Sequence, residues 1–410
     1  MLHPINPQGS LYKILNKVPF ILQIIIGMIL GIVLAIFIPK DHLVLPTLGT
    51  LFVSALKAIA PLLVFVLVSA SIARQDKGSK TNMKPIICIY FASMVLSSLV
   101  ALIMATAFPS TFNTLANAAT NATPKGISEV LLNFIRQAVD NPINALITGN
   151  YIGILVWGIA FGLLFRVSKP TTKEVLGDLA STVSGVVRIV IRFAPLGVMG
   201  LVYSSCTQEG GFYNLLNYLH VVVVLVSTML IIAFIVNPLI VFAVTRKNPY
   251  PLVFTSITQS AITAFFTRSS AANIPVNLSL CDKLGVPRET YTISIPLGCT
   301  INMAGAAVTI VVMTMAAVNT LGIHVDFASA LLMCIASVLC ACGTSGIAGG
   351  SLMLIPLSCS IFGISNDIAM QVVGIGFIIG VIQDSTETAL NSSSDVVFTA
   401  AACGITNVKK

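Results

Sequence analysis

Residues 18–38 form one uncharged, largely apolar run. A helix needs about 20 consecutive apolar residues to cross the hydrocarbon core of a bilayer, and this run reaches that length. Only 9% of the chain is charged and 56% is apolar, with a mean hydropathy of +0.97, whereas a soluble domain carries about 25% charged residues. No A-x-A-like cleavage site follows the run, which favours a retained span over a signal peptide. The sequence therefore predicts an all-α polytopic membrane protein.

Further apolar runs bring the predicted spans before residue 250 to 18–38, 46–73, 86–108, 148–165, 181–205 and 216–245. Lys and Arg concentrate in the cytoplasmic loops of membrane proteins. In this chain they lie mainly in every second loop between predicted spans, which predicts that both termini are cytoplasmic. The same asymmetry explains the net charge of +8, so we expect no nucleic-acid partner. The basic residues concerned are Lys13, Lys17, Arg74, Lys77, Lys80, Lys84, Arg166, Lys169, Lys173, Arg246, Lys247, Lys283, Arg288, Lys409 and Lys410.

Segments 251–283 and 326–362 are each too long for a single span and are interrupted in the middle. The first contains FFTRSSAANIP and the second contains CACGTSGIAGGS. Irregular backbone cannot face lipid, because unpaired N–H and C=O groups cost several kcal/mol each there. We therefore expect two re-entrant helical hairpins whose tips line a cavity. Paired interrupted helices of this kind indicate the binding site of a transporter.

A polar stripe lies in the last long apolar segment. Its five members fall within an arc of roughly 100° on a helix. An acid at the bilayer centre costs at least about 2.5–3.5 kcal/mol, so three acids need cations, hydrogen bonds or water. A helix end emerging into solvent is the alternative explanation. Arg268 of the first hairpin also needs an anionic partner, for which two of the acids are candidates. The stripe consists of Asp384, Glu387, Thr388, Asn391 and Asp395.

Three further polar or sulfur-bearing residues, Thr300, Asn302 and Met303, lie inside the apolar run 291–318. Carboxylate, amide and hydroxyl oxygens are hard ligands that suit an alkali cation. The N-termini of broken helices attract an anion such as an α-carboxylate, and an acid of the stripe would bind an ammonium group. The residues alone thus predict a cation-coupled carrier of a small zwitterion.

Four motifs follow one another in the second half of the chain: TRSSAANIPVN, TINMAG, GTSGIAGGS and QDSTETALNSSSD. Together they resemble those of the dicarboxylate/amino acid:cation symporter family, which has the glutamate-transporter fold. Within that family they are most similar to the bacterial sodium-coupled serine/threonine transporters.

The resemblance implies eight transmembrane helices plus two re-entrant hairpins, arranged as an elevator in a homotrimer of the bacterial cytoplasmic (inner) membrane. Residues 1–250 would form the first six helices, mostly scaffold and trimer contacts with parts of the transport domain. Residues 251–410 would form the transport core. Its expected elements are hairpin 1 at 251–283, helix 7 at 290–318, hairpin 2 at 326–362 and helix 8 at 367–403.

The resemblance also implies a substrate site. Asp384 would bind the amino group of the substrate and Asn391 its α-carboxylate, with Thr388 beside them. Hairpin 2 would close over the site as a lid. The hairpin tips would complete the pocket with Arg268, Ser269, Ser270, Ala271, Ile347 and Gly350.

Two sodium sites follow from the same resemblance. Asp395 and Asn302 would hold one co-transported Na⁺. A carbonyl of Thr300, a carbonyl of Thr344 and the Met303 sulfur would hold a second.

Three departures from the family pattern bear on specificity. Members that carry acidic amino acids have an Arg where this chain has Glu387, whose negative charge would repel aspartate or glutamate. Ala304 replaces an acid that helps to hold a third sodium ion in relatives. Ala306 replaces a hydroxyl near the substrate side chain. We therefore expect sodium-coupled uptake of small neutral hydroxyl amino acids, L-serine and L-threonine.

Three alternatives remain open at this stage. The substrate could be another amino acid or a dicarboxylate, and a channel would share the polar helix face. An intramembrane serine hydrolase would use Ser345 of the GTSG sequence as its nucleophile. That chemistry needs a His base within hydrogen-bond reach, and no His follows Ser345 in a later span. We therefore do not expect an enzyme.

Overall fold

The computed structural model describes residues 20–38, 42–73, 83–112, 115, 132, 135–208, 211–342 and 349–407. These residues form helices joined by turns, with no strand among them. The predicted all-α class is therefore confirmed. Both chain termini lie outside the described residues, so their predicted cytoplasmic location stays a prediction.

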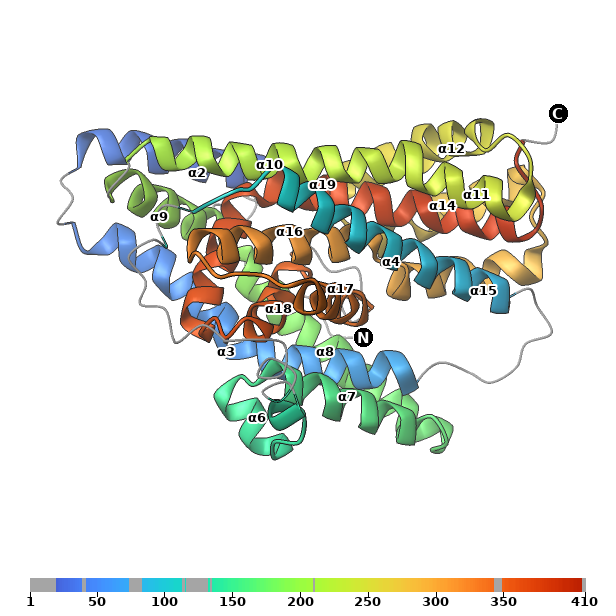
Figure 1. Ribbon diagram of the computed structural model, residues 1–410, viewed down its shortest axis with the longest axis horizontal. Coiled ribbons are helices and arrows are strands. Elements are labelled where there is room, and N and C mark those ends of the chain that lie inside the picture. Colours follow the sequence, from blue (N-terminus) through green and yellow to red (C-terminus); the bar gives the residue numbers. More distant parts are fainter. Residues whose placement is uncertain are drawn as a thin grey trace, which may run out of the picture.

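The helices pack in two groups, and the first group surrounds the long helix α3 (Figure 1). Its members are α2 (Phe20–Phe37), α3 (Val44–Ala73), α6 (Pro142–Thr148), α7 (Tyr151–Phe165), α8 (Pro170–Arg192) and α9 (Ala194–Thr207). Helix α3 packs against α7, α8 and α9, and α2 packs against α9.

The second group surrounds α19, the longest helix among the described residues (Figure 1). Its members are α4 (Met83–Ala107), α10 (Tyr213–Ile231), η2 (Ile232–Val236), α11 (Asn237–Thr245), α12 (Tyr250–Ser256), η3 (Ile257–Ala261), α13 (Ile262–Thr267), α14 (Ser270–Leu284), α15 (Arg288–Ile301), α16 (Ala304–Thr320), α17 (Phe327–Ala341), η4 (Leu352–Leu354), α18 (Ile355–Ile361) and α19 (Asn366–Ala402). Helix α19 contacts α10, α13, α14, α15, α16 and α18. It is buried on almost every side, so its polar side chains have to find partners inside the protein.

Glycines allow α2 and α9 to approach closely. A Cβ at Gly27 would overlap the backbone of Pro195, and a Cβ at Gly31 would meet the carbonyl of Met199 at 2.6 Å. Two glycines four residues apart are a common contact between membrane helices, where small residues let backbones touch. This contact fixes α2 to the first group.

Five helical stretches in the described part of the chain are long and apolar enough to cross a membrane, and the pair α8–α9 would make a sixth. That pair is bent by 52° between Arg192 and Ala194. Residues 181–205, predicted as one span, therefore belong to two helices, the first of which begins at Pro170. Pro195 explains the bend, because it has no N–H for the helical ladder and its ring clashes with the preceding turn. The expected total of eight spans stays a prediction.

The segment predicted as one helix at 290–318 is also interrupted. Helix α15 ends at Ile301 and α16 begins at Ala304, with Asn302 and Met303 between them in non-helical conformations. No proline or glycine stands at the break itself, so the sequence pattern gave no sign of it.

In segment 250–284, two helical arms meet at Arg268 and Ser269. Arg268 has a left-handed backbone, with φ of 50°, a conformation that is uncommon outside glycine and reverses the chain direction. The Ser269 side chain then caps α14 by accepting a hydrogen bond from the Ala272 N–H. The sequence around the tip therefore ends one helix and begins the next.

Hydrogen bonds tie both arms of this segment to α19. The Asn273 amide donates to the Ser260 hydroxyl at 3.0 Å and to the Ser392 hydroxyl at 2.8 Å. The Asn277 amide donates to the Ser392 carbonyl at 2.9 Å. Because these groups are buried, the network holds the Arg268 tip in a fixed position against α19.

Candidate functional site

The polar stripe of α19 lies inside the second group of helices. All five residues predicted for it are less than a tenth exposed. A helix end emerging into solvent therefore does not explain these acids. Their partners come mainly from the two interrupted segments, from α16 and from the break that precedes it.

Asp384 receives one donor from each interrupted segment. The Nε of Arg268 donates to Oδ2 of Asp384 at 2.7 Å. The backbone N–H of Gly349 donates to Oδ1 at 3.0 Å. The structure thus pairs Arg268 with Asp384, which is one of the two partners that the sequence indicated. This carboxylate therefore contacts both interrupted segments.

Arg268 keeps one unused donor at this site. Its Nη1 is buried and has no hydrogen-bond partner among the described residues. A buried unpaired donor costs about 1–3 kcal/mol, or more on a charged group. A ligand that brings an acceptor, such as a carboxylate, would remove this cost.

Glu387 contacts three donors and not Arg268. Thr309 of α16 and Ser351 each donate a hydroxyl hydrogen bond to its Oε2 at 2.7 Å. The side-chain amide of Gln383 donates to the same oxygen at 2.5 Å. Glu387 is therefore held as a hydrogen-bond acceptor between α16, α19 and the segment before η4.

Asn391 lies beside the N-terminus of α16. Its Oδ1 accepts a hydrogen bond from the Gly305 N–H at 2.7 Å. This bond leaves the Nδ2 amide, which is a donor, for another partner. Thr388 bonds back to its own helix, its hydroxyl donating to the Asp384 carbonyl at 2.7 Å.

Asn302, at the break between α15 and α16, joins the far end of the stripe. Its amide donates to the Ser394 hydroxyl at 2.8 Å and to Oδ1 of Asp395 at 2.9 Å. Its own Oδ1 is buried without a partner among the described residues. The Met303 N–H donates a hydrogen bond to the Met94 sulfur at 3.4 Å. It therefore does not bond to the Cys299 carbonyl, which would be its acceptor in a continuous helix. The break therefore gathers a carboxylate, an amide oxygen and at least one freed carbonyl.

Asp395 fits a pocket that only glycine leaves open. A Cβ at Gly298 would overlap the Asp395 carboxylate and stand 2.8 Å from the Tyr90 hydroxyl. That hydroxyl lies 3.2 Å from the Thr399 hydroxyl and donates to the Ser294 carbonyl at 3.3 Å. Asp395 is 1% exposed, so its carboxyl group is shielded from bulk water by the groups packed around it.

The structure places the other predicted site residues as follows. Ser270 and Gly350 are buried, while Ala271 is exposed. The Thr300 hydroxyl donates to the Leu297 carbonyl at 2.8 Å, within its own helix. Three of the predicted residues lie outside the described residues, namely Thr344, Ser345 and Ile347.

Sequence reasoning missed several groups that contact the stripe. Gln383 stands one turn before Glu387 and extends the stripe, so its i,i+4 spacing was a usable signal. Thr309 lies in a largely apolar helix that holds other threonines, and Ser351 follows a Gly pair. Nothing in the local sequence distinguishes these two hydroxyl residues from structural ones.

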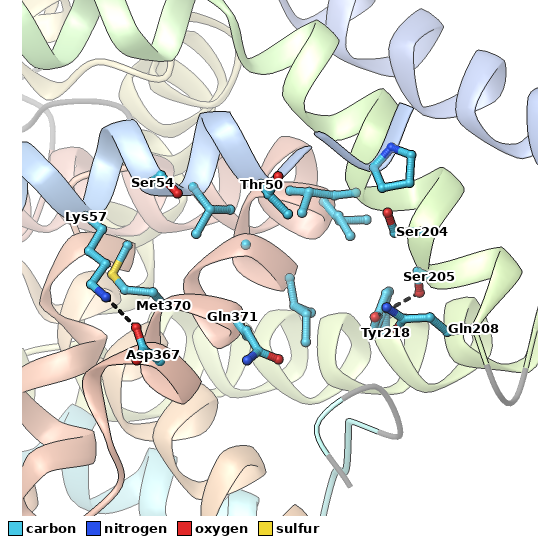
Figure 2. A pocket seen from close by; sticks show the side chains of 16 residues that line it. Thr50, Ser54, Lys57, Ser204, Ser205, Gln208, Tyr218, Asp367, Met370 and Gln371 are labelled. Atoms are coloured by element: carbon cyan, nitrogen blue, oxygen red, sulfur yellow. Dashed lines mark hydrogen bonds and ion pairs between the residues drawn. The ribbon is translucent and has the colours of Figure 1, made fainter. Parts of the chain in front are cut away.

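A separate cavity of about 450 Å³ lies between the two groups of helices, lined by α3, α9, α10 and α19 (Figure 2). Lys57 of α3 and Asp367 of α19 form an ion pair at one side of it. Ser205 and Tyr218 form a hydroxyl–hydroxyl hydrogen bond at the other side, at 2.9 Å. The cavity thus marks the boundary along which the two groups contact each other.

Comparison with families of known proteins gives one match over almost the whole chain. The family model described as the sodium:dicarboxylate symporter family matches residues 20–404. The match includes both interrupted segments and the whole of α19.

Proposed function

Because this chain belongs to the sodium:dicarboxylate symporter family, we propose that it takes up L-serine and L-threonine together with Na⁺. Membership itself shows a multi-pass membrane transporter with sodium-coupled symport of dicarboxylates or amino acids. The chain is therefore not an enzyme, and the hydrolase alternative based on Ser345 is wrong.

The site offers complementary groups for a zwitterion. In this proposal the substrate ammonium binds Asp384, where the guanidinium of Arg268 now supplies the positive charge. The α-carboxylate binds the Nδ2 amide of Asn391, which the Gly305 N–H orients through Oδ1. Thr388 stands beside them, and the tip residues Ser269, Ser270, Ala271, Ile347 and Gly350 complete the pocket.

In this proposal Glu387 is the residue that selects a neutral substrate with a hydroxyl group. A buried carboxylate in the stripe would face a second carboxylate on aspartate or glutamate, and like charges in a site with little water repel strongly. A hydroxyl can instead donate to it. Acidic substrates are the second candidate, since the family name includes dicarboxylates, and Arg268 Nη1 is the donor that would favour them.

Sodium is a co-transported ion in this proposal, and the residues near Asp395 fit it. An alkali cation takes oxygen ligands, and Asp395 lies beside the unpartnered Oδ1 of Asn302. The carbonyls of Thr300 and Thr344, together with Met303, form the second proposed site. Ion binding would offset buried negative charge before the core crosses the low-dielectric barrier.

Gly298→Ala is expected to weaken sodium binding. The added methyl group would displace the Asp395 carboxylate and the Tyr90 hydroxyl. We expect the sodium concentration that half-saturates uptake to rise about tenfold, which corresponds to about 1.4 kcal/mol. Gly185→Ala is the matched control, because a Cβ at that position meets open space. An unchanged sodium dependence in Gly298→Ala would remove Asp395 from the proposed ion site.

The two groups of helices would move relative to each other as scaffold and transport core of an elevator, within a homotrimer of the bacterial inner membrane. The pair Lys57–Asp367 crosses the boundary at which such sliding would occur. Lys57 lies near the middle of α3, and Asp367 is the second residue of α19.

Lys57→Glu is expected to shift the balance between positions of the core. The pair is partly exposed, with side-chain exposures of 41% and 80%, so the charge reversal should change the uptake rate by no more than about fivefold. The double variant Lys57→Glu/Asp367→Lys should restore the wild-type rate. If both single variants and the double variant behave alike, the pair has no role in the motion.

Calorimetric titration of the purified protein tests the proposed substrates. We expect L-serine and L-threonine to bind in sodium buffer and not in choline buffer, with no binding of L-aspartate. Aspartate binding in sodium without serine binding would favour the dicarboxylate candidate and overturn the proposal.

A further inference from the structure

One oxygen of Glu387 receives all of the hydrogen bonds that this carboxylate accepts from described residues. Thr309, Ser351 and Gln383 all donate to Oε2. The other oxygen, Oε1, receives none of them. A carboxylate has about four lone-pair sites, so Glu387 retains acceptor capacity on the oxygen that the described residues leave open.

The three donors hold each other as well as Glu387. The Gln383 amide also donates to the Thr309 hydroxyl at 2.8 Å. Gln383 and Thr309 are completely buried, and Ser351 is 1% exposed. Each hydroxyl has one proton, which it uses on Glu387. Both hydroxyl protons and one amide proton therefore point to Oε2, and the second amide proton of Gln383 points to the Thr309 hydroxyl.

The backbones at this point are in contact, which prevents the network from relaxing. A Cβ at Gly305 would stand 2.9 Å from the Glu387 carbonyl and 3.0 Å from its Cα. Helices α16 and α19 thus lie as close as glycine permits. The Thr309 hydroxyl, one turn along α16, is held against Glu387 by this close approach.

The side-chain amide of Gln383 provides a second oxygen that can accept a hydrogen bond. Its Oε1 is buried and has no partner among the described residues. The open oxygen of Glu387 and this amide oxygen can each accept a further hydrogen bond. The complementary ligand group is a hydrogen-bond donor without negative charge, such as an alcohol O–H.

We propose that Thr309, Ser351 and Gln383 are specificity-determining positioning residues. They hold Glu387 as an acceptor so that the site selects a side chain with an O–H over the same amino acid without it. This inference rests on the proposed function, and it extends the side-chain subsite to α16 and to the segment before η4. Because Ser351 belongs to the segment before η4, the subsite is complete only when that segment packs against α19.

The test compares L-serine with L-alanine, which differs by the hydroxyl oxygen alone. Sodium-driven uptake into liposomes is measured for both substrates, and the ratio of kcat/KM for serine to that for alanine is the readout. Hydrogen bonds to charged groups contribute about 1.5–3 kcal/mol, or about tenfold or more in affinity. We expect the ratio to fall at least tenfold in Thr309→Val and in Gln383→Met.

Controls separate positioning from general damage. Thr309→Ser keeps the hydroxyl and should restore the ratio. Thr314→Val removes a buried hydroxyl from the same helix that does not bond to Glu387 and should leave the ratio unchanged. If either core variant fails to fold, Ser351→Ala provides the same readout from outside α16 and α19.

The outcomes distinguish this inference from the proposed function. A wild-type protein that takes up no serine with sodium overturns both, whereas one that takes up serine and alanine equally well overturns the inference alone. A wild-type preference that persists in Thr309→Val, Gln383→Met and Ser351→Ala overturns the inference alone, since Glu387 would then select the hydroxyl without its donors. A fall in the ratio that Thr309→Ser reverses supports the inference.

Discussion

Replacing Glu387 by arginine is expected to reduce serine uptake by about 100-fold or more, because the site loses a charged acceptor and gains a buried cation facing three donors. Thr309, Ser351 and Gln383 all donate to the wild-type carboxylate. A guanidinium at this position cannot accept these bonds. It would instead attract a second carboxylate, so we expect L-aspartate to compete for uptake in Glu387→Arg but not in the wild type.

Glu387→Gln is the matched control for this prediction. It keeps the size of the side chain and its acceptor oxygen while removing the charge. We expect it to retain part of the serine uptake and to remain insensitive to aspartate. Uptake is measured in liposomes with labelled serine and with each amino acid as competitor. A substrate profile that is the same in Glu387→Arg and the wild type would mean that residue 387 does not face the ligand.

Asp384→Asn is expected to abolish uptake. The variant removes the negative charge that would bind the substrate ammonium. It also leaves the guanidinium of Arg268 without its charged partner, and breaking a buried pair in this way costs about 3–5 kcal/mol. The side chains of Arg268 and Asp384 are only 10% and 3% exposed, so solvent does little to reduce this cost. We expect a lower unfolding temperature together with the loss of transport.

The double variant Arg268→Gln/Asp384→Asn separates the two effects. It removes both charges, so the unfolding temperature should recover while uptake stays absent. Assembly is followed by size-exclusion chromatography, where we expect both variants to elute at the same volume as the wild type. Serine transport at the wild-type rate by either variant would contradict the role of Asp384 in binding the ammonium group.

Much of this fold could be predicted from the sequence, because long apolar runs define membrane helices. The stripe on α19 could be predicted because helical periodicity alone brings Asp384 and Asp395 to one face. The partner of Arg268 could be narrowed to two acids, because a buried cation needs an anion within reach. Both inferences depend on local pattern or on charge balance.

Other features could not be predicted because they depend on contacts between distant segments. The break at Asn302 has no helix-breaking residue, and its N–H groups are satisfied by Met94 and Asn391 from other helices. Thr309 and Ser351 are ordinary buried hydroxyl residues until α16 and α19 bring them to Glu387. Pro195 could have predicted the bend before Ala194, but the apolar run 181–205 favoured one continuous span.

Uptake of labelled L-serine by the purified protein in liposomes tests the central claim most directly. An inward sodium gradient is compared with potassium or choline in place of sodium, and L-threonine and L-aspartate are added as competitors. We predict sodium-dependent accumulation that threonine blocks and aspartate does not. Accumulation without sodium, or accumulation of aspartate in place of serine, would contradict the assignment of Glu387 and the proposed substrate while leaving the family and fold unchanged.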